Sequence, residues 1–258
     1  TVKGTNMEGK STVGREKLRR HLAGSSVNLF YVPALILVTV FSVYPLFSGF
    51  ALSLTNWDGL NPEKTFVGLA NYVTMLHDAN FRTILVNTLI YGVGSTIIQQ
   101  VLGLALALLL NSKIRGRNAL RAIIYLPALV SAVIMGTMYY LIFQYQQGAL
   151  NTILSALGLQ KVVWFNNPTT AVVIILLVNS FQFCGTSMII YLAGLQGMDQ
   201  SVVEAASLDG ATGWTKFWNI TMPMLMPAFS TSVVLNLIGG LKLFDVIKVL
   251  TGGGPGYS

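Results

Sequence analysis

AVVIILLVNSFQFCGTSMIIYLAG, residues 171–194, is an apolar run that contains no charged side chain. It is long enough to cross a bilayer as one helix, which takes about 20 residues. Similar runs lie on both sides of it, at about 28–53, 84–110, 119–143 and 224–250. Charged residues make up only 10% of the chain, against about 25% in a soluble domain, and the mean hydropathy is +0.64. The sequence therefore predicts an all-α membrane protein, a polytopic helical bundle with five spans within residues 28–258.

The few reactive side chains do not form a catalytic or metal-binding pattern. Cys184 is the single cysteine and lies within an apolar run, so we expect a buried, inert thiol and no disulfide. His21 and His77 are isolated, and no His, Cys or carboxylate cluster suits a metal. Gly252–Gly254 lacks the lysine and hydroxyl of a phosphate-binding loop. We expect a turn there, no enzymatic activity, and no cofactor or metal bound by this chain.

Lysine and arginine are distributed unevenly between the connections, which predicts the orientation. The tail 1–27 and the connection at 111–121 together carry ten of them, whereas the segments between spans one and two and between spans three and four carry three. Because cytoplasmic loops are enriched in Lys and Arg, the N-terminus is expected in the cytoplasm. The net charge of +7 is then explained by anchoring and topology, without nucleic acid.

A polar insertion separates the last two apolar runs, at about 199–223. It contains Glu204-Ala205-Ala206-Ser207-Leu208-Asp209-Gly210, in which helix-forming and small residues precede a glycine suited to a left-handed stop. Aromatic and apolar residues between Trp214 and Met222 predict a second short helix before Pro223. Parity of the spans places this insertion in the cytoplasm, where a soluble partner can reach it.

The spacing of Glu204-Ala205-Ala206, Gly210, Ile220 and Pro223 resembles the EAA motif of permease subunits of bacterial ABC importers, with Met222 in place of the usual leucine. Further segments resemble the sugar-type branch, the maltose and glycerol-phosphate permeases. They are Gly68–Tyr72, Asn87–Leu89, Leu102–Ala107, Gly116-Arg117, Leu126-Pro127, Leu192–Gln196, Phe244–Ile247 and Leu250–Gly256. The resemblance implies a type I ABC importer permease fold, with a sixth span expected beyond residue 258.

The resemblance also implies a function and partners. The chain would form half of the pathway for a sugar or oligosaccharide in a bacterial cell membrane, opposite a second, homologous permease subunit. Two ATPase subunits would bind ATP and Mg²⁺, and an extracytoplasmic binding protein would deliver the solute. The residues implied in coupling to the ATPase are Glu204, Ala205, Ala206, Asp209, Gly210, Ile220 and Pro223.

Each coupling residue has a physical role in this hypothesis. Glu204 would make a charge-assisted contact with the ATPase, and Ala205 and Ala206 would keep the helix narrow enough to enter a groove. Trp214, Phe217 and Ile220 would hold the loop against the bundle. The alternative is that Glu204 and Asp209 are only solvated charges.

Polar side chains inside the predicted spans are candidates for the solute path, because such residues tend to face a bundle interior. Asn179 and Gln182 lie in the fourth span and Asn236 in the fifth, and Tyr139 is a weaker candidate. The alternatives are hydrogen bonding between helices and, for Tyr139, the interfacial aromatic belt. Near the end of the fifth span, Lys242, Asp245 and Lys248 have a spacing that predicts a structural ion pair if the segment is helical.

Two other classes of protein fit the sequence less well. An ion-coupled secondary transporter would carry ionisable residues within its spans and an internal repeat, and neither is evident here. A membrane enzyme would need a catalytic constellation, which the chain lacks.

Overall fold

The computed structural model describes residues 31–60, 63–112 and 114–255. The basic tail 1–27 lies outside the described residues. The chain divides into two compact units, Thr1–Asp78 and Ala79–Ser258. Apart from one isolated bridge between Thr55 and Phe66, the regular structure of the described residues is helical, which confirms the all-α prediction.

The first unit contains the first span and a short connecting segment. The apolar helix Tyr31–Ser53 includes the π-helical turn η1 (Thr39–Val43) and α2 (Tyr44–Ser53). The chain then runs through an irregular segment into α3 (Ala70–His77). Asn71 joins these parts, because its Nδ2 donates to the carbonyl oxygens of Ser53 and Thr55 at 2.9 and 2.8 Å.

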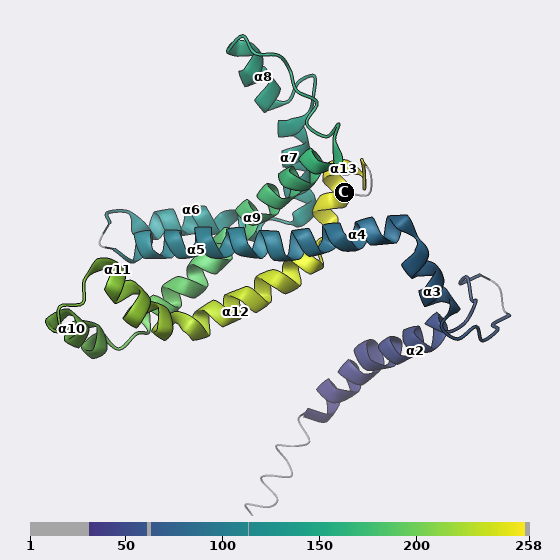
Figure 1. Ribbon diagram of the computed structural model, residues 1–258, viewed down its shortest axis with the longest axis horizontal. Coiled ribbons are helices and arrows are strands. Elements are labelled where there is room, and N and C mark those ends of the chain that lie inside the picture. The colour runs from purple at the N-terminus through teal and green to yellow at the C-terminus, as the bar shows by residue number, and fades with distance from the viewer. Residues whose placement is uncertain (1–30, 61–62, 113, 256–258) are drawn as a thin grey trace, which may run out of the picture. The chain divides into compact units, whose positions relative to one another are not determined.

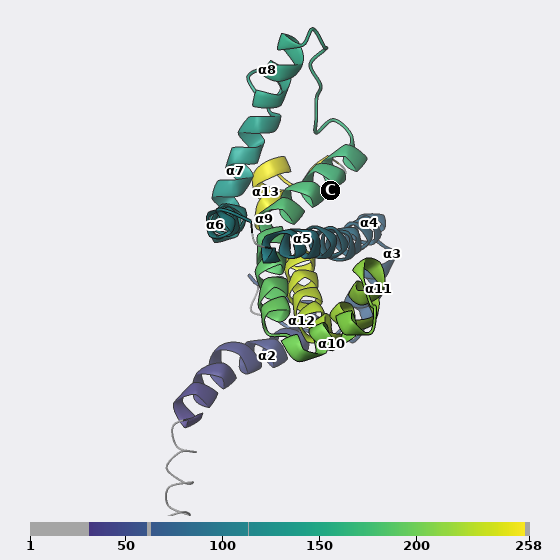
Figure 2. The same ribbon diagram turned by 90° about the vertical axis from the view of Figure 1, so that its left-hand side faces the viewer.

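The second unit is built around two long helices that lie side by side (Figures 1 and 2). One is continuous from Ala79 to Asn111 and comprises α4 (Ala79–Leu89), η2 (Ile90–Gly94) and α5 (Ser95–Asn111). The other is α9 (Pro168–Gln196), which begins where Asn167 accepts a hydrogen bond from the amide of Thr169 at 2.9 Å. They confirm the predicted spans 84–110 and 171–194 and extend beyond both.

The predicted third span, 119–143, is not one continuous helix. It consists of α6 (Arg117–Leu129) and α7 (Ala132–Phe143), which are bent by 97° at a short extended break. Pro127 precedes the break, and the Nε2 of Gln182 on α9 donates to the carbonyl oxygen of Val130 at 3.2 Å. Because the break leaves this carbonyl without a partner within its own helix, the contact with α9 satisfies it. From α7 the chain passes through α8 (Ala149–Ala156) to the start of α9.

The predicted fifth span, 224–250, is also corrected. A continuous helix runs from Gly213 to Leu241 and comprises α11 (Gly213–Lys216), η3 (Phe217–Thr221) and α12 (Met222–Leu241). The chain breaks at residues 242–244, and α13 (Asp245–Thr251) is a separate helix. Four helices are therefore long and apolar enough to cross a membrane, and a fifth span is counted when α6 and α7 are taken together, within the described ranges.

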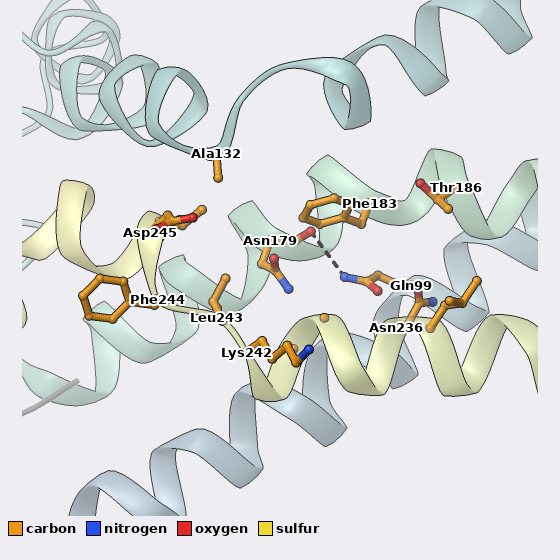
Figure 3. A pocket seen from close by; sticks show the side chains of 14 residues that line it. Gln99, Ala132, Asn179, Phe183, Thr186, Asn236, Lys242, Leu243, Phe244 and Asp245 are labelled. Atoms are coloured by element: carbon orange, nitrogen blue, oxygen red, sulfur yellow. Dashed lines mark hydrogen bonds between the residues drawn. The ribbon is translucent and has the colours of Figure 1, made fainter. Parts of the chain in front are cut away.

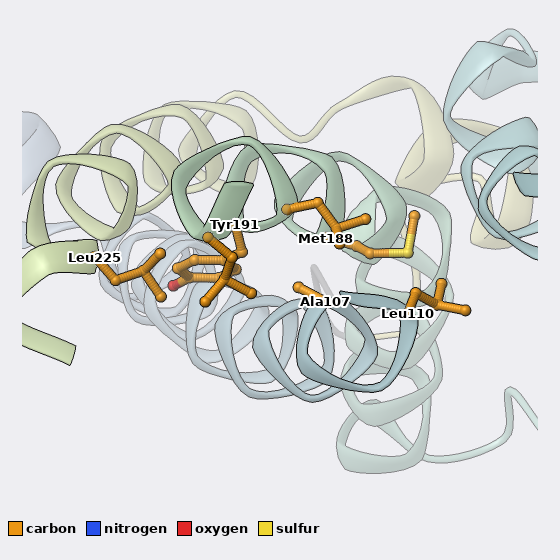
Figure 4. Close-up of a cluster of buried hydrophobic side chains, with 7 residues drawn as sticks. Ala107, Leu110, Met188, Tyr191 and Leu225 are labelled. Atoms are coloured by element: carbon orange, nitrogen blue, oxygen red, sulfur yellow. The ribbon is translucent and has the colours of Figure 1, made fainter. Parts of the chain in front are cut away.

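The largest apolar cluster joins α5, α9 and α12. It consists of Ala107, Leu110, Met188, Tyr191, Leu192, Leu195 and Leu225 (Figure 4). The close approach of α5 and α9 depends on Gly103, because a Cβ placed there would overlap the Cβ of Ser187 and lie 3.1 Å from the backbone nitrogen of Met188. The three helices therefore pack as one tight group.

Candidate functional site

The polar insertion folds as the short helix α10 (Gln200–Leu208), followed by a sharp turn. Asp199 caps the helix, since its Oδ1 accepts from the hydroxyl and the amide of Ser201 at 2.7 and 2.9 Å. These hydrogen bonds hold the pKa of the Asp199 carboxyl below its usual value. Capping by Asp199 defines where the helix begins.

Helix α10 ends in a turn at Gly210 that two backbone hydrogen bonds close. The amide of Ala211 donates to the carbonyl of Ala206 at 2.9 Å, and that of Gly210 donates to Ser207 at 3.2 Å. Gly210 has a φ of +86°, which glycine adopts without steric cost. This Schellman arrangement confirms the predicted left-handed stop.

The outer face of α10 is open to solvent. Glu204, Ala205, Asp209 and Gly210 are exposed, whereas Ala206 is only 8% exposed. Lys216 on α11 donates from Nζ to the Ser207 hydroxyl at 2.7 Å and so fixes α11 beside α10. The arrangement presents a narrow helix face with one carboxylate, Glu204, between small residues.

The second half of the insertion differs from the sequence-based prediction. No separate short helix ends before Pro223, because α11 and η3 continue directly into α12. Pro223 has no amide hydrogen to donate, and the π-helical turn η3 immediately precedes it.

The predicted anchoring role fits only part of this segment. Ile220 is partly buried within η3, whereas Trp214 is 75% exposed. Trp214 stacks with Phe217 at 6.0 Å between ring centroids rather than packing into the bundle. The expectation that Trp214 holds the loop against the bundle is therefore wrong.

A cavity of about 350 Å³ lies between α9, the end of α12 and α13 (Figure 3). Asn179 and Asn236, both predicted for the solute path, line it together with Gln99, Phe183 and Thr186. The Nε2 of Gln99 donates to the backbone carbonyl of Asn179 at 3.3 Å, and the side-chain amide of Asn179 lies at the cavity (Figure 3). Amide groups donate and accept hydrogen bonds, so this part of the wall suits a polar solute.

Gln182 and Tyr139 do not line this cavity. Gln182 is 1% exposed and bonds to Val130 at the α6–α7 break. Tyr139 packs against a second apolar cluster, whose buried members are Tyr91, Ile174, Ile175, Val178, Val246 and Leu250. The structure thus places two of the four predicted path residues on the cavity and two in packing positions.

The sequence-based prediction missed Gln99 and Gln100. Both are nearly buried on α5, where two consecutive amides in an apolar run are the signal that could have revealed them. Gln100 donates from Nε2 to Ser232 at 3.1 Å and accepts from the Tyr191 hydroxyl. A further bond, from Asn236 Nδ2 to the Ser187 hydroxyl at 2.7 Å, completes a polar seam between α5, α9 and α12.

The predicted ion pair at the end of the fifth span is not formed. Lys242 lies in the break after α12, while Asp245 opens α13, so the three charges do not share one helix. In the described segments, no ion pair within 4.0 Å joins Asp245 to Lys242 or Lys248. Lys242 and Asp245 instead line the cavity separately. Nor do the described residues include any group of three His, Cys, Asp or Glu side chains that could hold a metal.

A multi-span helical bundle with a cavity among its helices and an exposed short helix between two of its long helices is the architecture of a membrane transport subunit. Residues 99–257 match the model of the family described as "Binding-protein-dependent transport system inner membrane component". The chain belongs to this family, and the resemblance to ABC importer permeases is confirmed.

Several characterised proteins are similar over most of the chain. The trehalose/maltose transport system permease protein MalF of Thermococcus litoralis is 37% identical over 228 residues, which is 88% of this chain and 77% of that protein. The arabinooligosaccharides transport system permease protein AraP of Bacillus subtilis is 37% identical over 86% of this chain and 71% of its own length. A crystal structure of a bacterial alginate ABC transporter, in complex with an alginate pentasaccharide-bound periplasmic protein, contains a chain with a TM-score of 0.77 and 25% identity, covering 94% of this chain and 80% of that one.

Proposed function

We propose that this chain forms half of the translocation pathway of an ATP-driven importer for a neutral sugar or oligosaccharide. A second, homologous permease subunit completes the pathway, two ATPase subunits bind ATP and Mg²⁺, and an extracytoplasmic binding protein delivers the solute. The N-terminus and α10 face the cytoplasm. The carbohydrate-transport names of the relatives support the solute class.

The observation that carries the proposal is the position of α10. It is joined to α9 by residues 197–199 and to the continuous helix Gly213–Leu241 by residues 209–212. α9 carries Asn179 and α12 carries Asn236, both on the cavity. A displacement of α10 by an ATPase is therefore transmitted to the two helices that line the solute site, which is the movement that alternating access requires.

Glu204 is the residue of α10 that the ATPase contacts. Its carboxylate is exposed on the outer face, beside Ala205, and the neighbouring Ala206 packs inward. A charge-assisted hydrogen bond to a cationic or amide group of the ATPase contributes about 1.5–3 kcal/mol.

The alternative of an ion-coupled secondary transporter has no support. No Asp, Glu, Lys, Arg or His is buried among the residues that the structure describes. Ion-coupled transporters place such residues inside their spans, and family membership points to binding-protein-dependent transport.

The test uses the complete transporter in proteoliposomes, with its binding protein. We expect Glu204→Lys to insert and assemble but to separate ATP hydrolysis from uptake, with uptake lowered by about tenfold to a hundredfold. Glu63→Lys, which reverses another exposed carboxylate, serves as the control. Full ATP-driven uptake by an assembled Glu204→Lys complex would refute the coupling role.

A further inference from the structure

A second cavity, of about 370 Å³, lies where α7 ends and where the segment before α9 passes beside it. It shares no residue with the cavity at Asn179. In both views α8 and the end of α7 lie away from α10 and α11 (Figures 1 and 2). Its lining residues are Tyr140, Phe143, Gln144, Tyr145, Gln146, Val163, Trp164 and Phe165.

The lining combines aromatic rings with amides and contains no charged side chain. Tyr140 and Tyr145 are 45% and 47% exposed, so their rings remain available to a ligand. The Nε1 donor of Trp164 is buried and has no hydrogen-bond partner. Because this nitrogen is buried, a ligand in the cavity meets the Trp164 ring and not its donor.

Both walls of the cavity are fixed in place. The side chain of Asn151 is fully buried and donates from Nδ2 to the carbonyls of Tyr145 and Val162 at 3.1 and 2.9 Å. Lys161 donates from Nζ to the carbonyl of Gln146 at 2.9 Å. These bonds tie the segment after α7 to the segment before α9, so a ligand meets walls that are already ordered.

Two aromatic contacts also hold the end of α7 against the segment before α9. Phe143 packs edge-on against Trp164 and Phe165, with centroid distances of 5.7 and 5.8 Å. Phe143 thus orients Trp164 within the cavity wall.

We propose that this cavity binds a pyranose ring of a neutral oligosaccharide, as a subsite outside the transmembrane cavity. A pyranose has C–H faces that pack on the electron-rich faces of Tyr and Trp rings. Its hydroxyls can exchange hydrogen bonds with the Gln144 and Gln146 amides. The absence of a lining charge excludes selection for an acidic or basic ligand. The inference rests on the proposed carbohydrate transport.

The subsite also has a place in the transport cycle. With α10 in the cytoplasm, as proposed, this cavity opens at the outer end of the bundle. A saccharide held there is retained near the pathway entrance while the solute-binding protein is absent or dissociating.

The experiment measures saccharide binding to the complete transporter in phospholipid nanodiscs, without the binding protein and without sugar-headed detergent. Radiolabelled maltotriose, arabinotriose and lactose are the probes. We expect at least one to bind, and Tyr145→Ala to weaken it by about tenfold or more, because an aromatic contact is lost. Tyr140→Ala, which removes the other exposed tyrosine ring of the lining, is expected to weaken it as well.

Two control variants locate the binding. Tyr44→Ala removes a more exposed tyrosine ring from α2, and Asn179→Ala alters the other cavity; neither is expected to change binding at this subsite. Unchanged affinity in both Tyr145→Ala and Tyr140→Ala overturns the proposal.

The remaining outcomes separate this proposal from the proposed function. If a probe is taken up with the binding protein but no probe binds without it, only the subsite proposal is overturned. If the cavity is occupied only when the nanodiscs contain a glycolipid, it binds a lipid headgroup, and the subsite proposal is overturned as well. If no carbohydrate is taken up by the wild-type transporter with its binding protein, the proposed function itself fails.

Discussion

Gly103 allows the close contact between α5 and α9 to be tested by one added methyl group. In Gly103→Ala, the new Cβ would overlap the Cβ of Ser187 and lie 3.1 Å from the Met188 nitrogen on α9. A backbone atom cannot rotate away as a side chain does, so α5 and α9 must separate. Such overpacking costs about 1–3 kcal/mol.

The change from glycine to alanine also favours a helix, by about 0.5–1 kcal/mol. Gly239→Ala on α12 gives the same gain without the overlap, because no atom lies within 4 Å of a Cβ at that position. The difference between the two variants therefore isolates the packing cost. At about 2–4 °C per kcal/mol for a chain of this size, Gly103→Ala should unfold about 2–12 °C below Gly239→Ala.

The chain has one cysteine, Cys184, which is 5% exposed on α9. A thiol-reactive dye therefore reports the unfolding of this subunit, provided that the other subunits of the complex lack cysteine. A Gly103→Ala complex that unfolds at the same temperature as Gly239→Ala, or above it, would refute the α5–α9 contact.

Two further predictions concern the turn after α10 and the α6–α7 break. Gly210→Ala places a side chain at a φ of +86° at a cost of about 1–2 kcal/mol, so we expect weaker coupling of ATP hydrolysis to uptake in proteoliposomes. Gly49→Ala on α2, where an added Cβ meets no atom within 4 Å, should keep the wild-type ratio of ATP hydrolysed to solute taken up. Wild-type coupling in Gly210→Ala would contradict the role of this turn. Gln182→Leu removes the donor to the Val130 carbonyl and should destabilise the subunit by about 1–3 kcal/mol in the same dye assay. It should not alter which sugars are taken up. A changed sugar preference would instead indicate that Gln182 contacts the solute.

The apolar runs predicted the spans well, because the choice between water and lipid depends on local composition. The stop at Gly210 was also predictable, since a left-handed residue after a helix is a local preference. The role of Trp214 was not, because its 75% exposure depends on the direction in which α11 leaves α10.

Breaks in the third and fifth spans could not be seen in the sequence. Both lie in segments whose hydropathy permits a continuous helix, and the first is satisfied by Gln182, 52 residues further along the chain from Val130. Because a carbonyl released by a break needs a partner from elsewhere in a membrane bundle, the position of the break depends on the neighbouring helix.

By itself, the sequence determined the helical membrane class, the family and the polar insertion that carries Glu204. Only the tertiary structure decided which polar side chains line the cavity between α9, α12 and α13. Asn179 and Gln182 are three residues apart on one helix, yet the first lines the cavity and the second supports the α6–α7 break. Hydropathy scores both as polar residues within a span, whereas the packing of α5, α6 and α12 around α9 gives each of them a different neighbour.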